Sequence, residues 1–442
     1  MWVPNDLYGL LIVLFSLLIL LGLAEVWRYY GGGAEVTRKF VHISGGVVCL
    51  FLPFLIQSVW VVLGFAASIF LVFYFAEKNK RFMSIHGVAR KSHGTIYYPL
   101  AIFLIFFLSK NQPWLYVTPI LVLALCDSAA SLVGGKYGLH FYNVENEQKS
   151  MEGSLIFMLI AYLVIQIPIL LMTDIPRADV VMASLLVAIL VTGVEAISLE
   201  GTDNLFVPIS VCLVLARITT KTFDEMLYQN ISLIAICLFA WLGVWRFRAF
   251  NMGATILLVL FAYGTWSLGS ELWALPIFMM SLIYFALWAK YHGHVQFKFT
   301  KVRRATKALT VPFVILFSAN YTGQFSMMYP AFIAANAVLF SAIIVNFVRY
   351  DPKILRMQNI LRAFFISTLT WLLVAVPPWI VGAEINTSEL YWVWVVVFLL
   401  TVVLSYLPVL SDEKLDKLNS KNTLIPSIAA VSMVLVQFYA KV

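Results

Sequence analysis

An acidic residue inside an apolar run is the first feature of this sequence that could do chemistry. Asp127 lies in the run from residue 114 to 134, and at helical spacing it shares one helix face with Ala130, Ser131, Gly134 and Gly138. If the run crosses a membrane, an unpaired carboxylate there costs about 2.5 to 3.5 kcal/mol on insertion scales. We therefore predict that Asp127 is a catalytic residue, acting as the base. The alternative is a tight helix-packing face on which a neighbouring lysine satisfies Asp127.

The polar loop after this helix ends in a second candidate group, directly before the next apolar run: Lys149, Ser150, Glu152, Gly153 and Ser154. A lysine beside the free N–H groups of a helix N-terminus suits a phosphate group. We predict that these residues bind phosphates, with Lys149 and Glu152 also catalytic and Glu152 able to hold Mg²⁺. An ordinary helix N-cap at Ser150 or Ser154 is the alternative.

A third group of acids stands in the segment Val194–Asn204. Glu195 lies near the inner end of a predicted span, and Glu200 and Asp203 follow in the turn after it. Clustered carboxylates suit Mg²⁺, with substrate phosphates completing its coordination shell. The predicted metal ligands are therefore Asp127, Glu152, Glu195 and Asp203. For Glu200 and its neighbours, the alternative is a solvated acidic turn.

Two segments combine basic residues with a histidine: Arg38, Lys39 and His42 before the second span, and Arg90, Lys91 and His93 before the fourth. We predict that both contact phosphate or product, and that His42 is catalytic, since histidine can also transfer protons. The alternative is that the basic residues only anchor the spans at the cytoplasmic face, as Lys and Arg commonly do.

The elements that must position these residues are membrane helices. The chain has 442 residues, of which 62% are hydrophobic and 12% charged, and apolar runs of about 20 residues recur along it, the length that crosses a bilayer. We predict an all-α, polytopic transmembrane bundle of about 16 spans (14 to 18). Lys and Arg concentrate in alternate loops, which places both termini outside and the polar groups at the cytoplasmic face. The net charge of +8 does not indicate nucleic-acid binding, because no basic stripe accompanies it.

The polar groups also divide the chain in two. Nearly all of them lie in residues 1–225, which we predict to be a catalytic domain of about eight spans, whereas residues 226–442 form a second transmembrane domain of unknown role.

Several of these motifs together resemble the polyprenol kinase family, which includes dolichol kinase, phytol kinase and CTP-dependent diacylglycerol kinase. The resemblance lies in four blocks that follow in the family's order: Arg38-Lys39-x2-His42; Gly94-Thr95-Ile96-Tyr97; Asp127-x2-Ala130-x3-Gly134-x3-Gly138 with Lys149-Ser150-x-Glu152-Gly153-Ser154; and Glu195 with Asp203-Asn204-Leu205-x2-Pro208. They cover residues 25 to 220.

The resemblance implies that the γ-phosphoryl group of a nucleoside triphosphate, typically CTP, is transferred to the hydroxyl of a lipid alcohol of the phytol, dolichol or polyprenol class. It also implies that Gly134 and Gly138 belong to the nucleotide site. One alternative is a CTP-dependent cytidylyltransferase acting on a lipid phosphate, although that family usually has Ser-Pro-Lys-Lys-Thr where this chain has Glu147-Gln148-Lys149-Ser150. An ion-coupled transporter is the other alternative.

Overall fold

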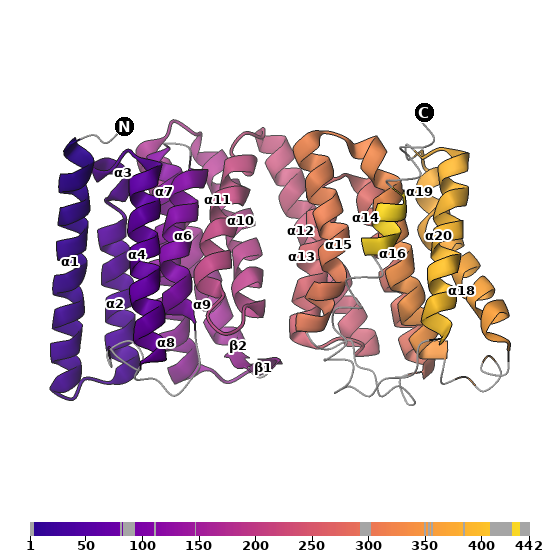
Figure 1. Cartoon of the computed structure of the whole chain (residues 1–442), viewed down its shortest axis with the longest axis horizontal. Coiled ribbons are helices and arrows are strands. Elements are labelled where there is room, and N and C mark those ends of the chain that lie inside the picture. The colour runs from indigo at the N-terminus through magenta and orange to yellow at the C-terminus, as the bar shows by residue number, and fades with distance from the viewer. Residues whose placement is uncertain are drawn as a thin grey trace. The chain divides into compact units, whose positions relative to one another are not determined.

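The chain forms two compact units, Met1–Ile231 and Ser232–Val442, which are described separately (Figure 1). The computed structural model describes residues 4–79, 82, 93–109, 112–145, 147–291, 302–348, 351, 354, 357–382, 385–406 and 427–433. Arg90 and Lys91, predicted to bind phosphate, lie outside the described residues.

Helices make up most of the first unit. They are α1 (Pro4–Tyr29), α2 (Ala34–Cys49), α3 (Leu52–Leu55), α4 (Val59–Lys78), α6 (Gly94–Leu108), α7 (Pro113–Leu121), the π-helix η1 (Val122–Cys126), α8 (Asp127–Tyr137), α9 (Met151–Met172), α10 (Arg177–Ile197) and α11 (Asp203–Ile218). The next helix, α12 (Phe223–Phe247), begins in this unit and ends in the other.

A short β-hairpin between α8 and α9 is the exception to the predicted all-α fold. Strands β1 (Phe141–Val144) and β2 (Glu147–Ser150) pair antiparallel, with Val144 opposite Glu147. The turn between them includes Glu145 in the left-handed region, at φ 54°, as tight hairpin turns require. Two strands of four residues carry too little alternation to stand out in a sequence of long apolar runs, so the segment was predicted only as a polar loop.

The helices of the described residues fit a multi-pass membrane protein. Eleven of them are long and apolar enough to cross a membrane, and three shorter apolar helices accompany them. The predicted polytopic, mainly helical architecture is confirmed at this level. The count of about 16 spans and the outer location of both termini stay predictions.

In the second unit the helices pack around one buried helix. The elements are α13 (Met252–Leu268), α14 (Glu271–Tyr291), α15 (Val302–Thr322), α16 (Phe325–Val348), α18 (Asn359–Val374), α19 (Val376–Ile380) and α20 (Thr387–Tyr406). Helix α16 is apolar on all sides and most of its residues are buried, as expected for a helix enclosed by others. Trp273 of α14 packs on Phe332 of α16, with ring centroids 4.6 Å apart.

Two close contacts hold α2 against the α7–η1 segment of the first unit. A Cβ atom added at Gly46 would lie 2.7 Å from the Ala124 Cβ and 3.0 Å from the Tyr98 hydroxyl oxygen. One turn away, the buried Tyr116 hydroxyl donates a 3.0 Å hydrogen bond to the Cys49 carbonyl. Glycine at position 46 therefore lets α2 approach the helix that carries Asp127.

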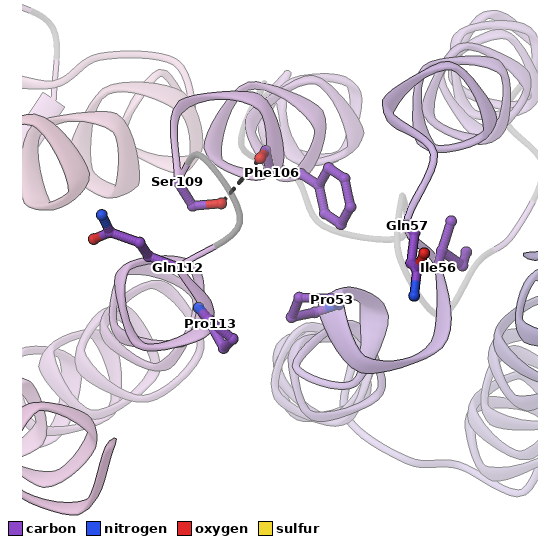
Figure 2. Close-up of a pocket in the computed structure, with 7 residues that line it drawn as sticks. All are labelled: Pro53, Ile56, Gln57, Phe106, Ser109, Gln112 and Pro113. Atoms are coloured by element: carbon purple, nitrogen blue, oxygen red, sulfur yellow. Dashed lines mark hydrogen bonds between the residues drawn. The ribbon is translucent and has the colours of Figure 1, made fainter. Parts of the chain in front are cut away.

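A cavity of about 280 Å³ lies at the other end of the first unit, near α3 and away from the hairpin (Figures 1 and 2). Its lining consists of Pro53, Ile56, Gln57, Phe106, Ser109, Gln112 and Pro113. Pro113 precedes Asp127 by 14 residues of nearly continuous helix, or about 21 Å along the axis. The cavity is therefore remote from the residues predicted to do chemistry.

We expect Gly46→Ala to destabilise the protein, because the added methyl group overpacks the contact of α2 with η1, at a cost of about 1 to 3 kcal/mol. Gly64→Ala is the matched control, since a Cβ there lies within 4 Å of no atom of the described residues and alanine favours a helix. Thermal unfolding in detergent should show a lower midpoint for Gly46→Ala alone. Equal midpoints for the two variants would contradict the close contact.

Candidate active site

An ion pair joins Asp127 to a residue far away in the sequence. Lys39 Nζ on α2 donates to Asp127 Oδ2 at 2.6 Å and to the Asp127 carbonyl at 3.3 Å. The Lys39 side chain is 5% exposed and that of Asp127 is 23% exposed. The Asp127 carboxylate thus has a lysine partner, as the helix-packing alternative predicted. Its side chain is also partly exposed, so a substrate could reach it.

The π-helix directly before Asp127 gives this pair a third member. A π-turn displaces the backbone hydrogen bonds of an α-helix, and such turns are frequent at functional sites. His42 Nε2 lies 3.0 Å from the Leu123 carbonyl of η1 and 3.7 Å from Asp127 Oδ2. Because a carbonyl oxygen only accepts, Nε2 must carry the proton. The structure therefore brings together Lys39, His42 and Asp127, and their catalytic roles stay a prediction.

The hairpin presents a second ion pair. Cross-strand pairing places Tyr142 opposite Lys149, and Val144 opposite Glu147, so these four side chains share one face. From this face Lys149 Nζ donates to Glu195 Oε1 at 2.8 Å and to the Glu195 carbonyl. The predicted phosphate-binding lysine is thus paired with one of the predicted metal ligands.

Opposing effects set the charge of Lys149. Burial by itself lowers the pKa of this ammonium group, but the negative charges of Glu195 and Asp203 outweigh it, so the pKa is raised. Lys149 is therefore fully charged near neutral pH. A charged lysine in strand β2 whose side chain is 14% exposed is chemically suited to a phosphate.

The predicted phosphate-binding glycines pack helix against helix. Ser150 is the N-cap of α9 and accepts a 3.1 Å hydrogen bond from the Gly153 N–H. A Cβ at Gly134 would lie 2.6 Å from Ser150 Oγ, and one at Gly138 would lie 2.9 Å from Ser150 Cβ. Ser154 Oγ lies 2.8 Å from the Tyr142 hydroxyl. The N-cap interpretation therefore describes Ser150 in this structure, while contact of these residues with phosphate stays a prediction.

Three other predicted residues are engaged in local pairs. Glu152 Oε1 lies 2.7 Å from His140 Nδ1 and accepts from the His140 N–H at 3.1 Å, across the base of the hairpin. Arg38 pairs with Glu35 at 2.6 Å. His93 Nδ1 lies 2.8 Å from Glu77 Oε1.

Electrostatic interactions link the two ion pairs into one neighbourhood. Asp127 and Asp203 both act on Arg38 and both act on Glu195. Asp203 stands at the start of α11, where its Oδ1 accepts the Asn204 N–H at 3.0 Å. The first turn of α11 and the end of α10 therefore belong to the same charged region as α2 and α8.

Within the described part of the chain, no group of three or more His, Cys, Asp and Glu side chains could hold a metal ion by itself. This fits the usual behaviour of Mg²⁺ in phosphoryl transfer, where one or two carboxylates and the substrate's phosphates share the ion. Next to Asp203, the buried Asn204 Oδ1 accepts no hydrogen bond from any residue that the structure describes, and such an oxygen is a ligand of the kind that Mg²⁺ prefers. The four-carboxylate ligand set stays a prediction.

Sequence reasoning missed several partners of the site, namely Glu35, Glu77, His140, Tyr142 and Glu147. For Glu147 a signal existed, because it stands two residues before Lys149 and shares its face once the segment is a strand. No comparable signal marks the others.

The chain has a relative of known activity. Over 186 residues, or 41% of this chain, it is 38% identical to a protein named phytol kinase from Synechocystis sp., and the match spans 78% of that relative. The chain belongs to the polyprenol kinase family. The recognition made from the four motif blocks is thereby confirmed. No family model and no solved structure matches the chain.

Removing the charge of Lys39 should leave Asp127 unpaired in the membrane segment. We expect Lys39→Met to lower stability by about 3 to 5 kcal/mol, as for other broken buried pairs. Lys39→Met combined with Asp127→Asn should recover much of this loss, because the stranded charge is gone. Thermal unfolding of both variants in detergent checks the pairing. A double variant less stable than Lys39→Met would contradict it.

Proposed function

We propose that the chain is an integral-membrane kinase that transfers the γ-phosphoryl group of a nucleoside triphosphate to the hydroxyl of an isoprenoid alcohol. The observation that carries this proposal is the pairing of Lys39 with Asp127 beside the pair of Lys149 with Glu195. The first pair can hold the acceptor hydroxyl and the second can hold the nucleotide. The activity named for the relative supports an isoprenoid acceptor of the phytol class.

In this reaction the alcohol oxygen forms a bond to the γ-phosphorus, and the bond from that phosphorus to the β,γ-bridging oxygen breaks. The alcohol proton passes to Asp127. Lys39 donates to Oδ2 and to the backbone carbonyl of Asp127. The other carboxylate oxygen, Oδ1, can therefore orient the hydroxyl of the alcohol. Phosphoryl transfer depends mainly on positioning and charge, so an aspartate held in place by a lysine suffices.

Lys149 binds the nucleotide in this proposal. Its ammonium group exchanges the Glu195 carboxylate for a phosphate oxygen, so a negatively charged partner is present before and after the exchange. Resemblance to the family favours CTP as the donor. Asp203 and the Asn204 Oδ1 would hold Mg²⁺ with the phosphates, and Mg²⁺ would neutralise their charge. Asp127, Glu152 and Glu195 stay in the proposed ligand set.

We assign catalysis to the first unit, because every described residue of the proposed site lies within Met1–Ile231. The loops that carry the hairpin and the α10–α11 turn are proposed to face the cytoplasm, where the nucleotide is. The lipid alcohol reaches the same edge from within the bilayer, so the two substrates meet where the membrane helices end.

Purified protein with Mg²⁺, γ-labelled CTP or ATP, and phytol, farnesol, dolichol or diacylglycerol should transfer label to an isoprenoid alcohol. We expect Asp127→Asn and Lys149→Ala each to lower kcat/KM by about 100-fold or more, as for other losses of a catalytic base or charge. Lys136→Ala is the matched control, since Lys136 is exposed at the end of α8.

Different products would separate the alternatives. Release of diphosphate with a cytidylyl lipid would select the cytidylyltransferase, and coupled ion flux without nucleotide consumption would select the transporter. Full activity in Asp127→Asn would remove Asp127 from the reaction.

A further inference from the structure

The turn between α10 and α11 is strained and held from several sides. Glu200 has φ 54° and Gly201 has φ 86°. A left-handed conformation is unfavourable for a residue other than glycine and persists only where the surrounding structure imposes it. The turn is short and joins Glu195, on the last turn of α10, to Asp203, the first residue of α11. Its shape therefore sets how these two acids lie relative to each other.

The peptide groups of Glu200 are held by two different elements. Its N–H donates to Glu147 Oε1 of strand β2 at 2.7 Å. Its carbonyl accepts from the His93 N–H, just before α6, at 2.9 Å. The His93 ring in turn lies 2.8 Å from Glu77 Oε1 near the end of α4. The left-handed residue is thus fixed between the hairpin and the beginning of α6.

Strand geometry ties this contact to Lys149. Glu147 and Lys149 are two residues apart on β2, so their side chains leave the same face of the strand. One reaches the turn at Glu200 and the other reaches Glu195. The hairpin therefore holds the α10–α11 segment at two points. Lys149 pairs directly with Glu195, and the charge of Asp203 also acts on it.

We propose that Glu147 is a positioning residue: by holding the strained turn at Glu200, it sets Glu195 and Asp203 around Lys149 for phosphoryl transfer. This inference rests on the proposed function for its catalytic consequence, whereas the hold on the turn does not depend on it. Glu147 acts through the turn and does not itself contact a reacting atom. Its role needs an acceptor oxygen at the end of a side chain of this length, and a glutamine supplies one.

Three variants of the full-length protein test the proposal. Glu147→Ala removes the acceptor, and Glu147→Gln keeps one. Gln148→Ala alters the next residue, which is exposed and faces away from the turn. Two measurements apply to each variant: hydrogen–deuterium exchange of the peptides covering residues 198–204, and steady-state kinetics with the labelled nucleotide and phytol.

We expect Glu147→Ala to raise exchange of the Glu200 amide about tenfold, the effect of losing one hydrogen bond to a charged acceptor. It should lower kcat about tenfold while the KM for the alcohol stays within about twofold, because the acids around Lys149 are displaced and the lipid site is not. Glu147→Gln should bring both the exchange of the Glu200 amide and kcat most of the way back to wild-type values. Gln148→Ala should match the wild type in both measurements.

Two results would overturn the proposal. Unchanged exchange in Glu147→Ala would show that Glu147 does not hold the turn. Raised exchange with wild-type kcat would show that the hold does not serve catalysis. If the wild type transfers no label with any donor and acceptor, the proposed function fails and the catalytic consequence fails with it, while the exchange result still decides whether Glu147 holds the turn.

Discussion

The cost of a carboxylate inside a membrane segment is the constraint on which the rest of the first unit depends. Asp127 is stabilised because Lys39, 88 positions earlier, reaches it from α2. That contact requires α2 to lie close to η1 and α8, and Gly46 against Ala124 permits the approach. The π-turn before Asp127 places the Leu123 carbonyl within reach of His42. The contacts that stabilise the Asp127 carboxylate therefore also bring Lys39 and His42 to the place where an alcohol could bind.

The other charged side chains of the proposed site are also held in pairs of opposite charge. Lys149 is paired with Glu195, Glu152 with His140, and Arg38 with Glu35. A nucleotide brings several negative charges, and it can therefore compete with the single carboxylate of Glu195 for Lys149. The hairpin sets the geometry of this exchange, because one strand carries both Lys149 and the residue that holds the α10–α11 turn.

Much of this architecture was predictable from the sequence, and the reasons are physical. Long apolar runs predict membrane helices, and an acid within such a run predicts a functional site. The partnership of Lys39 and Asp127 was not predictable in detail, since both residues were singled out but nothing in one sequence pairs positions 88 apart. The hairpin was missed because its strands have four residues each. The close packing of Gly134 against Ser150 and Gly153 was not predictable either, and the contact of these residues with phosphate stays a prediction.

The most direct test of the central claim is an experimental structure of the full-length protein with Mg²⁺ and a non-hydrolysable CTP analogue. We expect Lys149 Nζ to leave Glu195 and to lie about 3 Å from a phosphate oxygen. We also expect Lys39 to stay on Asp127 and the γ-phosphate to face that aspartate. A nucleotide bound elsewhere, with Lys149 still paired to Glu195, would show that Lys149 does not bind the donor.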